Sequence, residues 1–366
     1  MYIVIFFVIL AVLVLVHEFG HFYAAKKSGV RVDEFGLGFP PRLWSWQRGE
    51  TTYSVNAIPF GGFVKIFGEN NEDGVGSDGL VLKDPKSFVN KPKWIQVIIL
   101  SAGVIMNIVF AWALFSVAYM SGMTTGISEQ NSQYIEQSHI VVIDVMPNSP
   151  ADRAGLAVGD EIFSYNFSGA TTTITGAASI QDITKNSGGK PIRLEVLRMV
   201  GKSLVTVIPV RSGTTGDYMI GIAMDIVGSA HFPFGPAVVQ GAKLTWNVFA
   251  GTFVGLYGLI HDAFLGHADI SQLSGPVGIA RLVGDASRLG FVYLLSFTGF
   301  ISLNLAVLNL IPFPALDGGR ILFVIIEAIR RKTIHPRVAN TVNAIGFGLL
   351  ILLMLFITYR DVMKLV

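Results

Sequence analysis

The sequence predicts an α-helical multi-span membrane protein with four transmembrane helices, a membrane-associated β region and one soluble domain. Of its 366 residues, 51% are hydrophobic and only 14% are charged, whereas soluble proteins average about 25% charged residues. The mean hydropathy is +0.57. Long apolar runs lie towards both ends of the chain, and a more polar stretch of about a hundred residues, the size of one small domain, lies between them.

Composition also excludes several classes of protein. A net charge of +2 without a basic tract argues against nucleic acid as a partner. The chain has no cysteine, so disulfides, thiolate zinc sites and catalytic thiols are excluded.

The first span is predicted at residues 2–24. Residues 1–16 carry no charge, and neither a basic segment before them nor a small-residue cleavage site after them indicates a removable signal peptide. Basic residues follow the span at Lys26, Lys27 and Arg31. The positive-inside rule therefore places the N-terminus outside and residues 26–92 in the cytoplasm.

A metal-binding motif continues directly from this apolar run. His17-Glu18-Phe19-Gly20-His21 has two imidazoles at i and i+4, which share one face of a helix and can meet one metal, with a glutamate beside them to act on a water. At about 1.5 Å per residue, His17 lies about 24 Å along the helix. Since a bilayer core is about 30 Å thick, the motif predicts a zinc site for hydrolysis inside the membrane.

The segment after the first span is polar and glycine-rich. Residues 30–39, 51–58 and 63–66 are predicted strands of a small hairpin system, and Gly61-Gly62 predicts a turn or a bulge. Residues 70–84 are predicted to be a loop, and a second span is predicted at 95–120.

The middle of the chain, residues 125–228, is predicted to be the soluble domain. Residues 140–145 and 192–196 have strand character, and 200–202 connects the latter to a hairpin partner at 204–210. Because this domain follows the second span, we expect it to be extracytoplasmic.

Two further spans are predicted at residues 291–316 and 341–359. The most basic loop of the chain, 330–337, lies between them and belongs inside. Four parts follow: 1–124 with two spans, the soluble domain 125–228, an extracytoplasmic amphipathic helical segment 229–290, and 291–366 with two spans.

A catalytic zinc normally has three protein ligands and an open position, and Asp317 is the best candidate for the third. Pro312 and Pro314 must break the helix before it, and broken backbone at membrane depth is tolerated where it lines a wet cavity. Gly318 and Gly319 allow close backbone approach. The alternative is that Asp317 caps a helix or pairs with Arg320.

The three ligands must lie at one depth, which constrains the topology. If residues 244–260 crossed the bilayer, Asp317 would reach the wrong leaflet. Residues 236–266 are therefore predicted to be an amphipathic segment on the outer surface.

These motifs resemble the site-2 proteases, most closely the RseP-like bacterial regulated intramembrane proteases, over nearly the whole chain. The resemblance rests on HEFGH, on Leu316-Asp317-Gly318, on the β-region segments 36–41 and 58–65, and on Ser101-Ala102-Gly103 with Asn107. Residues 149–156 and 159–162 resemble a bacterial PDZ domain, with Met219, Ile220, Gly221 and Ile222 as its carboxylate-binding loop.

The resemblance implies His17, His21 and Asp317 as ligands of one Zn²⁺ per chain and Glu18 as the general base. It implies that Asn309 holds the substrate backbone. The strand residues Gly61, Gly62, Phe63 and Val64 are expected to capture an unwound substrate by strand addition.

The resemblance also implies partners and a location. The substrates would be single-span membrane proteins already cut by another protease, such as anti-sigma factors, or remnant signal peptides. The location would be the bacterial inner membrane, with both termini and the PDZ domain outside. The alternatives are a zincin whose site faces water, a metal-ion transporter and a non-enzymatic PDZ scaffold.

Overall fold

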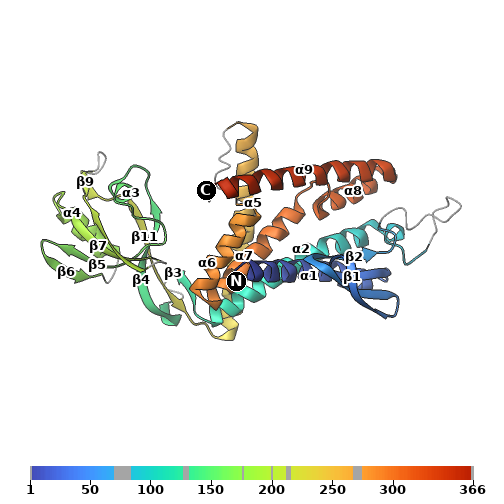
Figure 1. The fold of residues 1–366 in the computed structure, drawn as a ribbon, viewed down its shortest axis with the longest axis horizontal. Helices are drawn as coiled ribbons and strands as arrows, with labels where there is room; N and C mark the ends of the chain where they lie inside the picture. The colour runs from blue at the N-terminus through green and yellow to red at the C-terminus, as the bar shows by residue number, and fades with distance from the viewer. Residues whose placement is uncertain are drawn as a thin grey trace. The chain divides into compact units, whose positions relative to one another are not determined.

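The computed structural model describes residues 2–69, 84–126, 132–174, 177–198, 201–211, 216–266 and 274–363. The chain forms two compact units, one made of Met1–Val117 with Val238–Val366 and the other of Ala118–Ala237 (Figure 1). The predicted domain limits at 125 and 228 remain predictions. Most of the predicted loop 70–84 lies outside the described residues.

The first unit contains helices that are long and apolar enough to cross a membrane. They are α1 (Tyr2–Lys27), α2 (Lys93–Met120), α7 (Phe291–Leu310) and α9 (Pro336–Met363). Within the described part of the chain only these four qualify, and α5 (Phe234–Phe264) does not. The prediction of four apolar helices is confirmed.

The region after the third span differs from the prediction. α7 ends at Leu310 instead of 316, because Pro312 cannot continue a helix. The chain then enters α8 (Asp317–Arg330), which was not predicted as a separate helix. Its Ile321 and Val324 pack on the apolar cluster that joins α1 to α2.

One face of the first span packs against neighbouring helices of its unit. Leu13 of α1 is fully buried, and with Phe6 and Ile9 it packs against Val283 of α6 (Pro276–Leu289). At Gly20 a Cβ atom would lie only 2.3 Å from the carbonyl oxygen of Ala102. Glycine at this position therefore lets α1 approach the backbone of α2.

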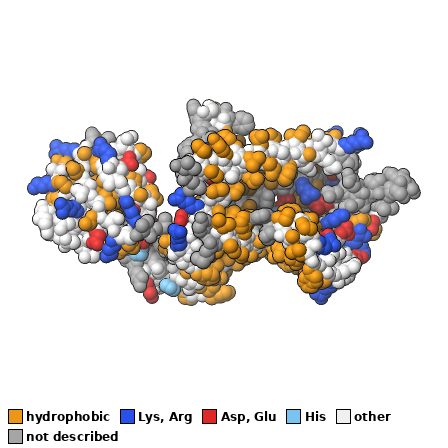
Figure 2. Space-filling view, in the orientation of Figure 1, with side chains coloured by type: hydrophobic (Ala, Val, Ile, Leu, Met, Phe, Trp, Pro, Cys, Tyr) orange, Lys and Arg blue, Asp and Glu red, His pale blue; other side chains and the backbone are white. Residues whose placement is uncertain are grey.

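Two further long helices, α9 and α5, leave apolar side chains exposed. α9 exposes many apolar side chains, and Figure 2 shows hydrophobic side chains along it. α5 runs across the direction of α2 and α9 in Figure 1. Its Leu244, Val248 and Phe249 pack near Phe115 of α2. An exposed apolar surface of this kind fits a lipid environment.

The predicted β region is present as β1 (Val32–Arg48) and β2 (Thr51–Ile66). Residues 34–37 are registered against 62–65 and also against 52–55, so the two strands fold into more than a simple hairpin. Gly61 has a φ of +94° and lies among shifts in the register. Residues 52–55 run in the same direction as 34–37 and residues 62–65 run in the opposite direction, so β2 reverses direction between Val55 and Gly62, next to the predicted turn or bulge at Gly61-Gly62.

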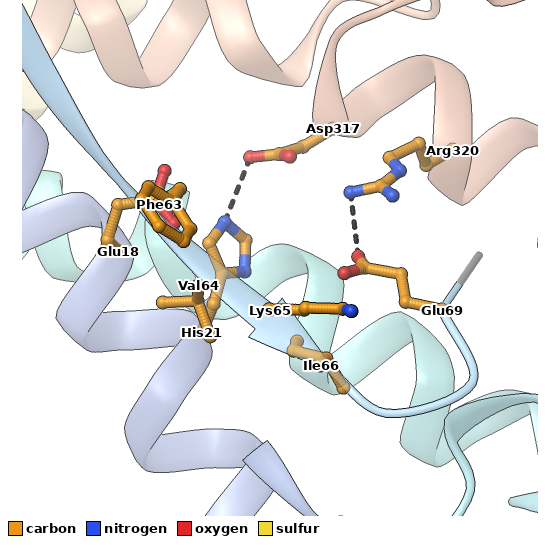
Figure 3. A pocket seen from close by; sticks show the side chains of 9 residues that line it. All are labelled: Glu18, His21, Phe63, Val64, Lys65, Ile66, Glu69, Asp317 and Arg320. Atoms are coloured by element: carbon orange, nitrogen blue, oxygen red, sulfur yellow. Dashed lines mark ion pairs between the residues drawn. The ribbon is translucent and has the colours of Figure 1, made fainter. Parts of the chain in front are cut away.

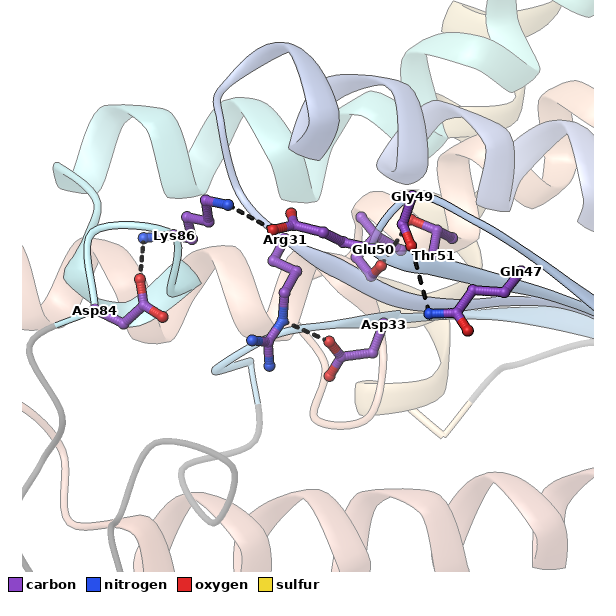
Figure 4. Close-up of polar contacts among 9 residues, drawn as sticks. Arg31, Asp33, Gln47, Gly49, Glu50, Thr51, Asp84 and Lys86 are labelled. Carbon is purple, nitrogen blue, oxygen red and sulfur yellow. Dashed lines mark hydrogen bonds and ion pairs between the residues drawn. The ribbon is translucent and has the colours of Figure 1, made fainter.

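Polar contacts tie this region to the chain that leads into α2 (Figure 4). The Lys86 ammonium donates to Glu50, and Arg31 donates to Asp33 at 2.8 Å. The hydrogen bond from Lys86 holds the pKa of the Glu50 carboxyl below its usual range. Both members of the Lys86–Glu50 pair are exposed, so the pair contributes little to stability.

The second unit is built on a seven-stranded sheet with the order β3-β11-β4-β5-β7-β8, in which β6 pairs with β5. The members of this sheet are β3 (Met123–Gly126), β4 (Ile135–Val145), β5 (Glu161–Phe167), β6 (Ala170–Thr173), β7 (Ile192–Arg198), β8 (Gly201–Val207) and β11 (Ile222–Ala230). β9 (Val210–Arg211) and β10 (Tyr218–Met219) form a separate short pair, and α3 (Pro150–Arg153) and α4 (Ala177–Asn186) complete the unit. The strands predicted at 140–145 and 192–196 are present, and the hairpin partner predicted at 204–210 is present as β8, which begins at Gly201 and ends at Val207.

An apolar core holds this sheet and α4 together. Ile180 of α4 is buried among residues of the sheet that include Ile162, Leu194 and Val196. This core shares no member with the clusters around α1, so the second unit has a core of its own.

Candidate active site

His17 and His21 lie on one buried face of α1. Their exposed fractions are 8% and 7%, and their Nε2 atoms are 3.2 Å apart. This closeness follows from the four-residue spacing on a continuous helix. The predicted pair is therefore assembled by local geometry alone.

Asp317, the first residue of α8, completes a group of three. Its Oδ2 atom lies 3.0 Å from Nε2 of His17 and 3.3 Å from Nε2 of His21. The possible ligand atoms of the three residues all lie within 4.8 Å of one another, and in the described residues they form the one such group. The structure thus brings together residues about three hundred positions apart.

The break before α8 positions Asp317. Ala315 has a φ of +74°, and its N–H donates to the Asn343 side-chain oxygen of α9 at 3.2 Å. A Cβ atom at Gly318 or Gly319 would lie within 2.3 Å of a carbonyl oxygen of the break. The break is therefore fixed by a tertiary contact with α9 and by glycines, which have no Cβ, at positions 318 and 319.

The second span provides the space for the ligands. A Cβ atom on Gly103 would lie 2.4 Å from Nε2 of His21 and 2.8 Å from Nε2 of His17. The backbone of α2 also orients a ring, because Nδ1 of His21 lies 2.8 Å from the Ile99 carbonyl oxygen. Since a carbonyl only accepts, Nδ1 of His21 carries a proton, and in the neutral ring Nε2 then presents a lone pair.

The donor set fits a zinc ion. Nε2 of His21 lies 3.3 Å from a carboxylate oxygen of Asp317, a contact that is favourable when a cation, a metal ion or a proton, lies between the two atoms. The Oδ2 atom of Asp317 is buried and accepts no hydrogen bond. Two imidazoles and one carboxylate with a further position open are a typical catalytic zinc set.

Two cavities adjoin these residues, and Glu18 lines both. The larger, of about 380 Å³, is also lined by His21, Asp317, Phe63 and Val64 (Figure 3). The smaller, of about 240 Å³, is lined by His17, Asp317, Asn107 and Asn309 among others. A substrate group in either cavity would be next to Glu18.

The other predicted site residues fall into two places. Gly62 lies beside Glu18, whose Cγ is 3.7 Å from where a Cβ of Gly62 would be, and Gly61, next to it, has a φ of +94°. In the second unit, Met219 is in β10, Ile220 is buried, Gly221 has a φ of +80°, and Ile222 begins β11.

The alternative roles considered for Asp317 find no support. No side-chain cap is present at the start of α8. Arg320 instead pairs with Glu69 at 2.7 Å, at the edge of the larger cavity (Figure 3). Asp317 faces the histidines, as the ligand prediction requires.

Several groups that contact or position the three proposed ligands could not be assigned from the sequence. The spacing of Gly103 and Asn107 on one helix was noticed only as a family motif, and the contact from Asn343 had no local signal. The Ile99 carbonyl is a backbone group, so no residue type could have indicated it.

Comparison with known proteins identifies the family of this chain. A family model described as Peptidase family M50 matches residues 5–353. A "Putative zinc metalloprotease" of Clostridium perfringens is 35% identical over 367 residues, covering 99% of this chain and 98% of its own. A protein with the same description from a Nostoc species is 36% identical, covering 98% and 94%. The chain therefore belongs to peptidase family M50, the site-2 protease family, and is a zinc metalloprotease.

Proposed function

We propose that this protein uses one zinc ion to cleave peptide bonds within the transmembrane segments of single-span membrane proteins. The observation that carries the proposal is the meeting of His17, His21 and Asp317 at 3.0 to 3.3 Å, on or beside helices that could cross a membrane. His17, His21 and Asp317 are the proposed ligands, and Glu18 is the proposed general base.

The chemistry follows from the residues around the two cavities. Zinc supplies Lewis acidity, which polarises a carbonyl and eases the deprotonation of a water. The Glu18 carboxylate takes the proton of the attacking water and passes it to the leaving amine. The buried histidine rings and the Asp317 carboxylate keep the reacting centre fixed relative to Glu18.

A helical substrate must unwind before its peptide bonds become accessible, and the β region offers a partner for the unwound piece. Phe63 and Val64 line the larger cavity and pair with Gly36 and Phe35 on one side. In the described chain no strand is registered on their other side, where a substrate strand could add. Asn309 in the smaller cavity is suited to hold the substrate backbone by its side-chain amide.

The second unit is proposed to be a PDZ domain on the extracytoplasmic side of the bacterial inner membrane, with both chain termini on that side. The N–H of Ala151 donates to the Ile220 carbonyl at 2.9 Å, so the 219–222 loop packs against the start of α3. A Cβ atom on Gly221 would lie 2.4 Å from Cβ of Ser149. Such a tight glycine loop beside a strand supports a carboxylate-binding role.

The proteolytic function is tested with a model single-span substrate in liposomes. Glu18→Gln should abolish cleavage while zinc content stays near that of the unmodified protein, because it removes the base and no ligand. Cleavage by the Glu18→Gln variant at the normal rate would overturn the mechanism. Zinc flux into the liposomes without cleavage would favour a metal-ion transporter, and neither activity would favour a scaffold.

The proposed substrates are already cut outside the membrane, as anti-sigma factors or remnant signal peptides are, and the second unit would exclude uncut ones. Deleting it should leave zinc binding and hydrolysis intact but relax the requirement for prior cutting. The comparison is cleavage of full-length and pre-cut substrate by intact and deleted enzyme in the same membranes. If the deleted enzyme is equally selective, the domain instead docks a partner.

A further inference from the structure

We infer that Asn107 is a positioning residue that accepts a hydrogen bond from Nδ1–H of His17 and thereby presents Nε2 of His17 to the metal. The inference rests on the proposed zinc site and assigns a task to a residue that is not itself one of the proposed ligands. The side chain of Asn107, on α2, is polar and fully buried.

The side-chain amide of Asn107 faces the His17 ring. Its Nδ2 lies 3.3 Å from Nδ1 of His17, while its Oδ1 is buried and accepts no hydrogen bond. A buried amide oxygen without a donor is destabilising, because it has given up its hydrogen bonds to water and gained none. Rotating the amide by 180° exchanges the two atoms and turns the orphan oxygen into the acceptor for the ring.

The direction of this hydrogen bond decides whether His17 can bind a metal. If Nδ2 donates, Nδ1 of His17 must accept, and the neutral ring carries its proton on Nε2. That proton would point at Oδ2 of Asp317, 3.0 Å away, and Nε2 would have no lone pair for a metal. If Oδ1 accepts, the proton moves to Nδ1 and Nε2 is free to act as a ligand.

The partner histidine already has this arrangement. His21 donates from Nδ1 to the Ile99 carbonyl, two helical turns before Asn107 on the same helix. α2 would therefore orient both rings, one through its backbone and one through a side chain. Ser302 of α7 donates to the Asn107 carbonyl at 2.8 Å, which fixes α2 at this point.

The test separates an acceptor from a donor at position 107. Asn107→Asp keeps an acceptor of the same size, whereas Asn107→Leu removes all hydrogen bonding. Zinc affinity is measured by competition with a chelator in detergent, alongside the melting temperature of the metal-free protein. We expect Asn107→Leu to weaken zinc binding by about 10–100-fold and Asn107→Asp to stay close to the unmodified protein.

Controls separate this inference from the zinc site itself. Asn304→Leu changes a half-buried asparagine on α7 whose side chain donates to the Phe300 carbonyl of its own helix, and it should leave zinc affinity unchanged. If Asn107→Leu does not fold, Asn107→Ala, which adds no bulk, takes its place. Unchanged affinity in the Leu or Ala variant, or equal losses in the Asp and Leu variants, would overturn the inference. Absence of zinc from the unmodified protein would instead overturn the proposed site.

Discussion

His17 and His21 lie four residues apart on an unbroken helix, whereas Asp317 follows a break between α7 and α8. On α1, helical periodicity alone brings the two rings together. At the break, the position of Asp317 depends on a left-handed alanine, on two glycines without room for a Cβ and on a hydrogen bond from that alanine to Asn343 of α9. One side of the site is encoded locally and the other by tertiary contacts, so the two sides should respond differently to mutation.

The largest effect is expected at Gly103 of α2, where the absence of a Cβ leaves space for the rings of His17 and His21. Gly103→Ala should abolish zinc binding and proteolysis, because the added Cβ would lie 2.4 Å from Nε2 of His21. Zinc content after purification and substrate cleavage are the measurements. Gly348→Ala on α9, where a Cβ meets nothing within 4 Å, is the matched control. Normal zinc content in Gly103→Ala would show that the ligands do not converge there.

Removing the distant ligand should have the next largest effect. Asp317→Asn keeps the shape of the side chain but removes the negative charge, and it should lower zinc occupancy together with activity. His21→Ala should do the same from the α1 side. If Asp317→Asn kept full metal and full activity, the third ligand would have to lie elsewhere.

The same contrast explains how far the sequence could predict the site. HEFGH could be placed on one helical face from its spacing, and Asp317 could be proposed because prolines and glycines in an apolar run mark a break. The third span was nevertheless predicted to run to residue 316, and α8 was not predicted as a separate helix, since tertiary contacts such as that with α9 fix the chain after the break.

The β region shows the same limit. Strand character was evident at 51–58 and 63–66, but the double pairing of residues 34–37 was not. Pairing depends on which backbone edges meet in space, and a single sequence does not record that. The contact from Asn343 to Ala315, 28 residues away, was invisible for the same reason.

That contact gives an intermediate prediction. Asn343→Ala removes the acceptor for the Ala315 N–H, a loss of about 1 kcal/mol, and should weaken zinc binding by up to about tenfold through Asp317. Zinc competition and proteolysis measure the effect. Asn340→Ala, at an exposed position of the same helix, should change neither. Identical behaviour of the two variants would mean that α9 does not hold the break.

The smallest effect is expected at Ala315 itself, where a glycine would relieve backbone strain in the folded state but would also stabilise the unfolded state. A left-handed conformation costs a non-glycine residue about 1–2 kcal/mol, which Ala315→Gly would relieve. Glycine also gives the unfolded chain more freedom, at a cost of about 0.4–1 kcal/mol. The melting temperature should therefore rise only slightly, with zinc affinity unchanged. Ala315→Val should lower the melting temperature, because a β-branched residue fits φ of +74° less well than alanine. If Ala315→Val were as stable as the unmodified protein, the break would not impose this backbone, and Asp317 would owe its position to the glycines that follow it.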